Sequence, residues 1–389
     1  MPGEIKEITL SRAKLEGEVR ISGAKNSVLR LLAASLLTDE PVTIENYPDS
    51  LLDAQVHEGM LEALGKRCDA SAPQVLTITE NSAPPSELVW DGRSIRNTLL
   101  ILGALTARTG KGKVPLPGGC KLGDRKYDIH VQVLEDLGAR VWDEGDFLCA
   151  EVEGHGRLKG ADVRLPMRST GATENALIMA SLAEGTTRIW GPHVRPEIFD
   201  LIKFLTSMGA KIETRGQESF IVEGVEKLSG VQHRVIPDNV EAITWMIGAA
   251  ITDGDVEIID FPYDHLEIPL INLRESGAQF YRNGNRMIVR GGTCYPIELS
   301  TGPYPGINSD MQPLFAVYGA QAEGESRIID LRFPGRYAYA EELSKLGIRY
   351  EVRDNLLIIK GRDPWRGANV TALDLRAGAA LLLAALNAD

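Results

Sequence analysis

An internal repeat with a spacing of about 70 residues most limits what this chain can fold into. Five segments share one order: an apolar helix rich in small residues, a short turn of Gly, Asp or Glu, and a β-branched strand. These segments begin at Leu31, Leu99, Ala176, Trp245 and Leu314. Because such a unit cannot bury both of its faces alone, the copies must pack on one another.

A second marker follows the same spacing. In each copy another helix ends at a glycine and a strand follows, at Gly65, Gly138, Gly209, Gly277 and Gly347. Glycine suits the position after a helix because the backbone there takes a positive φ, so we expect all five to be caps of this kind. A sixth copy starts in "DLRAGAALLLAALNAD" and stops at Asp389, and we expect this last repeat to be incomplete.

Composition narrows the class of protein and its partners. A chain of 389 residues is too long for one ordinary core, so we expect two domains. A net charge of −12 argues against nucleic acid as the main partner, and the longest apolar runs are too short to span a membrane. The four cysteines form neither a zinc motif nor a disulfide framework. We therefore expect a cytoplasmic protein without metal or cofactor.

Several helix starts in the first half combine small residues with cations or capping groups. Lys25 and Asn26 open a helix in "SGAKNS", Arg96 precedes one in "SIRNTLL", and Ser169 begins one in "RSTGATENA". The free N–H groups of a helix start favour anions. Each residue alone is explained as well by a solvated cation or a plain N-cap.

The second half of the chain shows similar chemistry. Asp310 precedes an apolar helix in "SDMQP", where a carboxylate can cap the helix or accept a proton from a hydroxyl. Arg332, Arg336 and Arg376 also lie beside apolar helix starts, which suits binding of carboxylate or phosphate, although each alone is more often in a surface ion pair. The "GKGK" segment at 110–113 lacks the rest of a phosphate-binding loop, and we expect a solvated hairpin turn.

One cysteine has an unusual setting. The segment "LPGGCKLGDRKYDIH" places Cys120 directly after two glycines and close to Lys121, Arg125 and Lys126. Positive charge lowers the pKa of a thiol by stabilising the thiolate. The pattern indicates a reactive thiol in a loop that acts on an anionic substrate.

Six segments occur here in the order found in a known family. "GAKNS", "LPGGCKLGDR", "STGATENALIMASLAEGTT", "PDNVEA", "SDMQP" and "DLRAGAA" resemble the enolpyruvyl transferases, and among them the UDP-N-acetylglucosamine 1-carboxyvinyltransferase (MurA) branch. The resemblance implies an α/β (α+β) fold of two inverse α/β-barrel (α/β prism) domains, each built from three βαβαββ repeats. One domain would comprise residues 1–23 and 237–389, and the other residues 24–236 with the Cys120 loop.

The resemblance also implies a reaction: the enolpyruvyl group of phosphoenolpyruvate moves to a hydroxyl of a uridine nucleotide, and phosphate is released. The catalytic positions of the family match Lys25, Asn26, Cys120 and Asp310. The positions that bind phosphoenolpyruvate match Lys25, Arg96, Arg125, Arg336 and Arg376. Those that bind the acceptor match Arg125, Lys126, Tyr127, Asp128, Ile129, Ser169, Thr170, Gly171, Asp310 and Arg332. We expect fosfomycin, an epoxide phosphonate similar to phosphoenolpyruvate, to alkylate Cys120.

Three departures from the family pattern leave the identity of the acceptor substrate undecided. Lys126 and Tyr127 replace the Pro-Val pair that usually lies near the uracil, and Arg332 replaces a small apolar residue near the sugar. The family also has an arginine in the last repeat, which this sequence does not reach. The alternatives are UDP-N-acetylglucosamine for peptidoglycan, UMP as in nikkomycin and polyoxin biosynthesis, and a MurA-like regulator that binds ligand without turnover.

Overall fold

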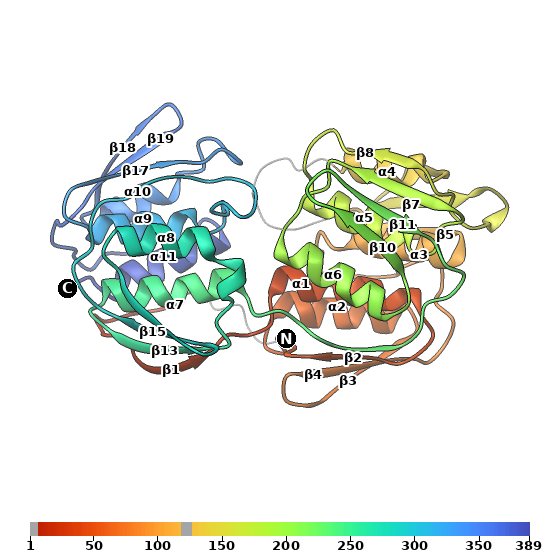
Figure 1. The fold of residues 1–389 in the computed structure, drawn as a ribbon, viewed down its shortest axis with the longest axis horizontal. Coiled ribbons are helices and arrows are strands. Elements are labelled where there is room, and N and C mark those ends of the chain that lie inside the picture. The colour runs from red at the N-terminus through yellow and green to blue at the C-terminus, as the bar shows by residue number, and fades with distance from the viewer. Residues whose placement is uncertain (1–6, 118–126) are drawn as a thin grey trace. The chain divides into compact units, whose positions relative to one another are not determined.

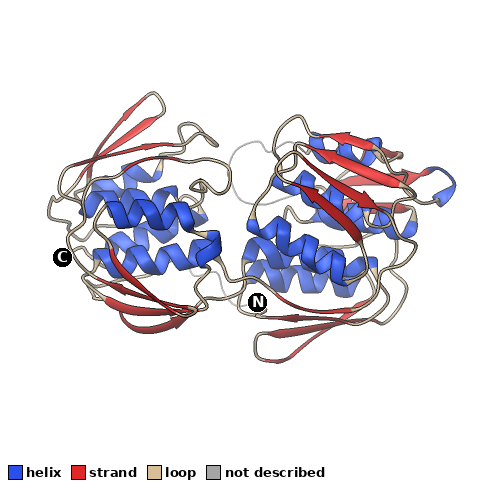
Figure 2. Ribbon diagram, in the orientation of Figure 1, coloured by secondary structure: helices blue, strands red, loops and turns tan. Residues whose placement is uncertain are grey.

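The structure is a computed structural model that describes residues 7–117 and 127–389. The chain divides into two compact units, unit 1 with Met1–Ile21 and Pro237–Asp389, and unit 2 with Ser22–Ile236. Within each unit the helices lie inside and the sheets lie outside them (Figures 1 and 2). This is the inverse of the usual arrangement of an α/β domain, in which helices cover a central sheet.

The strands described in unit 2 form three sheets around its helices. The helices are α1 (Lys25–Ala34), α2 (Leu52–Ala63), α3 (Thr98–Thr109), α4 (Asp128–Asp136), α5 (Thr170–Ala180) and α6 (Pro196–Ser207). The strands are β2 (Val42–Glu45), β3 (Lys66–Ala72), β4 (Val75–Glu80), β5 (Lys111–Pro115), β6 (Ala139–Glu144), β7 (Phe147–Val152), β8 (Asp162–Arg164), β9 (Thr186–Trp190), β10 (Lys211–Arg215), β11 (Ser219–Glu223) and β12 (Val231–Arg234). They pair in the orders β12-β2-β4-β3, β5-β7-β6 and β10-β11-β9-β8.

The strands described in unit 1 form two sheets, β1-β13-β15-β14 and β16-β17-β19-β18. Its helices are α7 (Asn239–Ile251), α8 (Glu267–Glu275), α9 (Gln312–Gln321), α10 (Tyr339–Lys345) and α11 (Leu375–Ala385). The strands are β1 (Glu16–Arg20), β13 (Asp255–Ile259), β14 (Gln279–Asn283), β15 (Arg286–Arg290), β16 (Glu298–Ser300), β17 (Glu325–Ile329), β18 (Arg349–Arg353) and β19 (Leu356–Lys360).

The repeat found in the sequence is a repeat of structure. Each of the five apolar helices α1, α3, α5, α7 and α9 leads into a strand, and that strand pairs antiparallel with the second strand of a hairpin. In four sheets a parallel partner completes the other edge, as β12 does for β2 and β1 does for β13. The predicted fold class is confirmed.

The five glycines of the second marker adopt the expected conformation. Their φ angles are +83° at Gly65, +89° at Gly138, +106° at Gly209, +87° at Gly277 and +94° at Gly347. The expectation for the "GKGK" segment was wrong. Gly110 alone turns the chain, with φ at +78°, and the next residues form β5, which pairs with β7. The segment occupies the place in its repeat where a strand follows the apolar helix.

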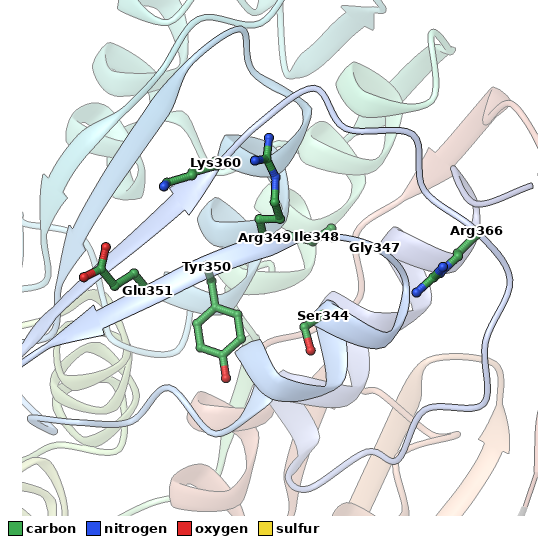
Figure 3. Close-up of a pocket in the computed structure, with 8 residues that line it drawn as sticks. All are labelled: Ser344, Gly347, Ile348, Arg349, Tyr350, Glu351, Lys360 and Arg366. Atoms are coloured by element: carbon green, nitrogen blue, oxygen red, sulfur yellow. The ribbon is translucent and has the colours of Figure 1, made fainter.

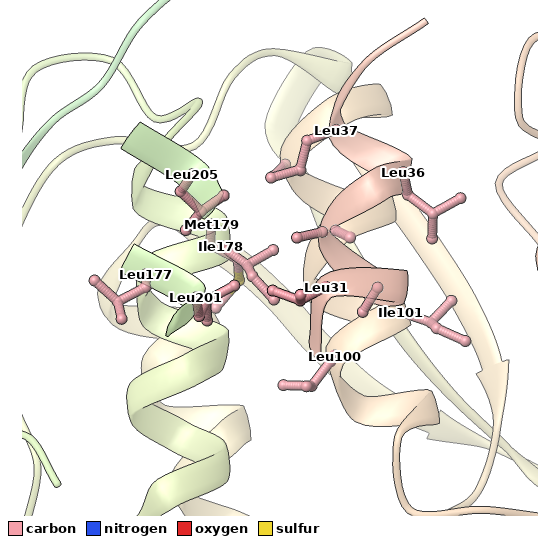
Figure 4. Close-up of a cluster of buried hydrophobic side chains, with 14 of the residues drawn as sticks. Leu31, Leu36, Leu37, Leu100, Ile101, Leu177, Ile178, Met179, Leu201 and Leu205 are labelled. Atoms are coloured by element: carbon pink, nitrogen blue, oxygen red, sulfur yellow. The ribbon is translucent and has the colours of Figure 1, made fainter. Parts of the chain in front are cut away.

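The central helices are buried on all sides, which explains their continuous apolar sequences. In unit 2, side chains of α1, α3, α5 and α6 fill one core, and Figure 4 shows Leu31, Ile101 and Ile178 within it. A Cβ atom at Gly103 of α3 would lie 1.9 Å from Asn175 Oδ1 of α5, so only glycine permits this approach. The tight packing fixes where the starts of these helices lie within the unit.

In unit 1, the core forms around α7, α9 and α11. Helix α11, which starts the sixth copy of the repeat, packs against α9 and α10. Among the described residues, none of the helices is long and apolar enough to cross a membrane.

Candidate active site

In unit 1, two arginines converge on Asp310. Asp310 Oδ1 lies 3.4 Å from Arg336 Nη1, and its Oδ2 lies 3.5 Å from Arg376 Nη2. The side chain of Asp310 is 26% exposed, and those of Arg336 and Arg376 are 11% and 18% exposed. Guanidinium groups next to a carboxylate favour its charged form.

The guanidinium group of Arg336 is buried but poorly satisfied. Its Nε and Nη2 atoms have no hydrogen-bond acceptor among the described residues, and Nη2 lies 3.6 Å from Asp374 Oδ1. Charge-assisted hydrogen bonds are usually 2.7 to 2.9 Å long, so these contacts are loose. Since a buried donor without an acceptor is costly, the group is suited to bind an anion from outside the chain.

Local hydrogen bonds fix the backbone close to Arg336 and Arg376. Asp374 is the N-cap of α11 and accepts from the N–H groups of Arg376 and Ala377, at 2.7 and 2.9 Å. Asp330 is fully buried and accepts from the N–H groups of Arg332 and Phe333, both at 2.9 Å. The loop that contains Arg336 is therefore organised from the core.

Asp310 lies shortly before helix α9. Helix α9 begins at Gln312 with Met311 as N-cap, and no side chain caps it. Asp310 is thus not the N-cap residue of α9, and its carboxylate contacts Arg336 and Arg376. Arg332 is exposed, and its guanidinium lies 5.6 Å from the ring of Phe333, while that of Arg336 lies 5.7 Å from the same ring.

In unit 2, Lys25 is the first residue of α1. Its Nζ lies 2.6 Å from Asp53 Oδ2 at the start of α2. Ala24, the N-cap of α1, supplies no side-chain hydrogen bond, and the half-buried Asn26 follows Lys25. The helix start therefore combines N–H groups that lack a side-chain cap with an ammonium group that a carboxylate holds in place.

Helix α5 begins at Thr170, directly after the predicted cap. Ser169 is its N-cap and accepts from Ala172 N at 3.4 Å, and Thr170 Oγ1 lies 2.6 Å from His193 Nδ1. A Cβ atom at Gly171 would lie 2.9 Å from His130 Nε2, so this glycine lets the imidazole approach the helix start.

His130 is a neutral imidazole beside the α5 start. Burial, together with Arg96 and Arg30, lowers its pKa to about 3. Asn175 Nδ2 donates to its Nδ1 at 3.2 Å, so the proton of the neutral ring resides on Nε2, the atom that faces Gly171. The half-buried Arg96 precedes α3 and is close enough to affect this pKa.

The remaining predicted positions fall around the start of α4. Tyr127 is its N-cap, and the hydroxyl donates to Asp143 at 3.1 Å. Asp128 is the exposed first residue of α4, and Ile129 packs partly on the core. Cys120, Arg125 and Lys126 lie outside the described residues.

No group of three potential metal ligands occurs among the residues that the structure describes. A shallow groove of unit 1, drawn in Figure 3, is lined by Arg349, Tyr350, Lys360, Arg366 and neighbouring residues of β18, β19 and α10. Arg349 there forms two hydrogen bonds to Asp363, and the groove contains none of the predicted site residues.

The comparison with known families concerns nearly the whole chain. The model of the EPSP synthase (3-phosphoshikimate 1-carboxyvinyltransferase) family matches residues 10–389. The chain belongs to this family of enolpyruvyl transferases. It is 41% identical over 380 residues to a UDP-N-acetylglucosamine 1-carboxyvinyltransferase of Carboxydothermus hydrogenoformans, covering 96% of this chain and 88% of the relative. A relative of the same name in Koribacter versatilis is 38% identical, with 96% and 87% covered.

Solved structures of enolpyruvyl transferases have the same fold. The enolpyruvyl transferase NikO from Streptomyces tendae aligns with a TM-score of 0.87 at 27% identity, covering 97% of this chain and 90% of that chain. EPSP synthase from Acinetobacter baumannii aligns with a TM-score of 0.77 at 20% identity, covering 97% and 91%. This protein is therefore a transferase, as the sequence predicted.

Sequence reasoning missed several residues that shape the site. Contacts with predicted residues or their loops are made by Asp53, His130 and Asp330. No regular spacing in the sequence relates these residues to their partners. Asp374 could have been found, because it immediately precedes the apolar helix α11 as an N-cap.

Proposed function

We propose that this enolpyruvyl transferase moves the enolpyruvyl group of phosphoenolpyruvate to a hydroxyl of UDP-N-acetylglucosamine in the cytoplasm, for peptidoglycan synthesis. The observation that carries the proposal is Asp310 between Arg336 and Arg376, with buried nitrogens of Arg336 lacking an acceptor within the described chain. The reaction needs a base for the hydroxyl and cations for the phosphate and carboxylate of the donor. The names of the two bacterial relatives support the same acceptor.

In the proposed reaction, the hydroxyl oxygen of the acceptor bonds to the central carbon of phosphoenolpyruvate while a proton adds to its methylene carbon. Asp310 accepts the hydroxyl proton, and Cys120 donates the proton to the methylene. The bond between carbon and phosphate oxygen then breaks, and phosphate leaves with the electron pair and takes up the proton from Asp310. The new methyl group returns a proton to the Cys120 thiolate, which restores the double bond. Lys25, Arg336 and Arg376 stabilise the anionic groups, and Asn26 holds the tetrahedral intermediate.

The test of this proposal is phosphate release from phosphoenolpyruvate by the purified chain. We expect release with UDP-N-acetylglucosamine to be at least about tenfold faster than with UMP or shikimate 3-phosphate, and a product whose mass contains the enolpyruvyl group. Absence of release with all three acceptors would contradict the proposal. Release with UMP alone would replace the acceptor and keep the reaction.

UMP is the second candidate acceptor, and Arg332 is the observation that favours it. Its guanidinium is exposed beside the ring that Arg336 also contacts, where a terminal phosphate would gain a charge-assisted hydrogen bond. Under this alternative, Arg332→Ala abolishes turnover with UMP. Arg282→Ala is the matched control, because Arg282 is also exposed in unit 1 and lies 4.1 Å from the ring of Tyr263.

Fosfomycin is proposed to alkylate Cys120 and stop the reaction. The other three cysteines are less reactive because burial raises their thiol pKa values, to about 12 for Cys68 and also upward for Cys149 and Cys294. We expect intact-mass spectrometry to show one adduct per chain, formed faster with acceptor present. An adduct that persists in Cys120→Ser, or none on the wild type, would refute the assignment.

A further inference from the structure

A buried ion pair links the two helices that begin at proposed site residues. Arg30 Nε of α1 lies 2.8 Å from Glu174 Oε1 of α5. Glu174 is fully buried, and the side chain of Arg30 is 17% exposed. Arg30 lies little more than one turn after Lys25, and Glu174 lies one turn after Thr170. The pair thus connects α1 and α5 near the middle of each helix, about one turn after its start.

Burial of this ion pair costs desolvation free energy. Burial raises the pKa of Glu174 although Arg30 opposes the shift, so desolvation outweighs the attraction. Neither oxygen of Glu174 has a hydrogen bond of normal geometry within the described residues, and Asn175 Oδ1 and His57 Nε2 lack one as well. An apolar pair of similar volume is often as stable as a buried ion pair, or more stable. Stability alone therefore does not account for these residues.

An ion pair provides a contact between two specific groups, which the apolar core lacks. Helices α1 and α5 both pack against α3 and α6 through leucine, isoleucine and methionine side chains, several of which Figure 4 labels. Such contacts tolerate small shifts, because apolar attraction depends on area and not on direction. The Arg30–Glu174 contact joins two specific atoms 2.8 Å apart, although without normal hydrogen-bond geometry, so their charge attraction favours one register of the two helices.

We propose that Arg30 and Glu174 are positioning residues. They hold the start of α1, which contains Lys25 and Asn26, in register with the start of α5, which contains Ser169 to Gly171. The inference rests on the proposed function, because these starts are assigned to the donor and the acceptor. Neither Arg30 nor Glu174 takes part in the chemistry itself. Their contribution is the placement of two binding groups within unit 2.

The test replaces the pair by apolar residues of similar size. We expect Arg30→Met/Glu174→Leu to melt at or above the wild-type temperature while kcat/KM falls at least about tenfold and KM rises for both substrates. Wild-type kinetics in this variant would overturn the proposal, because the pair would then serve stability only. If the double variant does not fold, Arg30→Lys and Glu174→Asp keep the charges and alter the geometry, and wild-type kinetics in both would equally overturn it.

A matched control separates positioning from general loss of stability. Arg108 of α3 is also 17% exposed and forms two hydrogen bonds to Glu80 of β4, at 2.6 and 2.8 Å, near the other end of the central helices. Arg108→Met leaves Glu80 paired with Lys66. We expect this variant to lose stability without a change in KM.

Hydrogen exchange keeps the inference testable if the proposed function fails. Absence of phosphate release by the wild type would disprove the function, whatever the pair does. In that case, peptides that span residues 25–34 and 170–180 are compared between wild type and the stable double variant. At least about tenfold faster amide exchange in both supports the positioning role, whereas unchanged exchange in both contradicts it.

Discussion

At the scale of single residues, the environment of Asp310 determines what it can do. Arg336 and Arg376 lie 3.4 and 3.5 Å from its carboxylate oxygens, and cations at this distance favour the charged form of a carboxylate. An ionised carboxylate that is 26% exposed can still receive a proton from a bound hydroxyl. This setting is thus suited to a base that must take up and release a proton.

Replacing this carboxylate by an amide tests the role. We expect Asp310→Asn to lower kcat by about 100-fold to 10,000-fold, because an amide keeps the shape of the side chain but cannot serve as a base. KM for the acceptor should change little. Steady-state kinetics at saturating phosphoenolpyruvate measure both constants.

Asp253→Asn is the control for this substitution. Asp253 is a surface residue of unit 1 that pairs with Lys14 at 2.9 Å and is 74% exposed. Its change to asparagine should leave the kinetics as they are. A proportional rise of KM with unchanged kcat in Asp310→Asn would instead assign Asp310 to acceptor binding.

At the scale of elements, buried polar contacts connect the start of α3 in unit 2 with α1 and α2. Asn97, the N-cap of α3, donates to Leu29 O of α1 at 2.7 Å and to His57 Nδ1 of α2 at 3.0 Å. His57 is fully buried, and burial together with Arg30 lowers its pKa to about 3. Its imidazole is therefore a neutral acceptor that ties α2 to the start of α3.

The lowered pKa of His57 makes stability depend on pH. In the unfolded chain the pKa of His57 is about 6.5, so below this pH the unfolded chain binds a proton and the folded chain does not. The free energy of unfolding therefore falls as the pH falls. Because His57 remains neutral in the folded state down to about pH 3, acidification from pH 7 to pH 5 should cost about 2 kcal/mol through this residue. Burial lowers the pKa of His130 to about 3 as well, and it adds a similar loss.

Urea unfolding of the wild type and of His57→Gln at pH 7 and pH 5 measures this contribution. Glutamine can still accept from Asn97 but does not titrate, so we expect the variant to lose about 2 kcal/mol less than the wild type over this interval. Only the difference between the two pH values is compared, which removes the effect of the substitution at neutral pH. An equal loss in both proteins would show that His57 becomes protonated within the folded state.

At the scale of the whole molecule, one repeated unit accounts for both compact units and for the position of their helix starts. Each copy places an apolar helix inside and a hairpin sheet outside, so the starts of the central helices recur at the same place in every copy. The proposed site residues occur at such starts, as Lys25, Ser169 and Arg376 do, or in the residues just before them, as Arg96 and Asp310 do. They belong to both units.

The sequence alone determined the repeat, the fold class, the capping glycines and the family. Each depends on a local pattern: the spacing of apolar residues, the preference for glycine where φ is positive, and short motifs in a fixed order. Only the tertiary structure decided which side chains meet. Asp53 with Lys25, Glu174 with Arg30 and Asp330 with the Arg332 loop are contacts between segments that chain spacing does not relate. These contacts arise because the packing of buried helices and sheets sets the distances between segments in space. The energies of desolvation and charge pairing then act between the groups that this packing brings together.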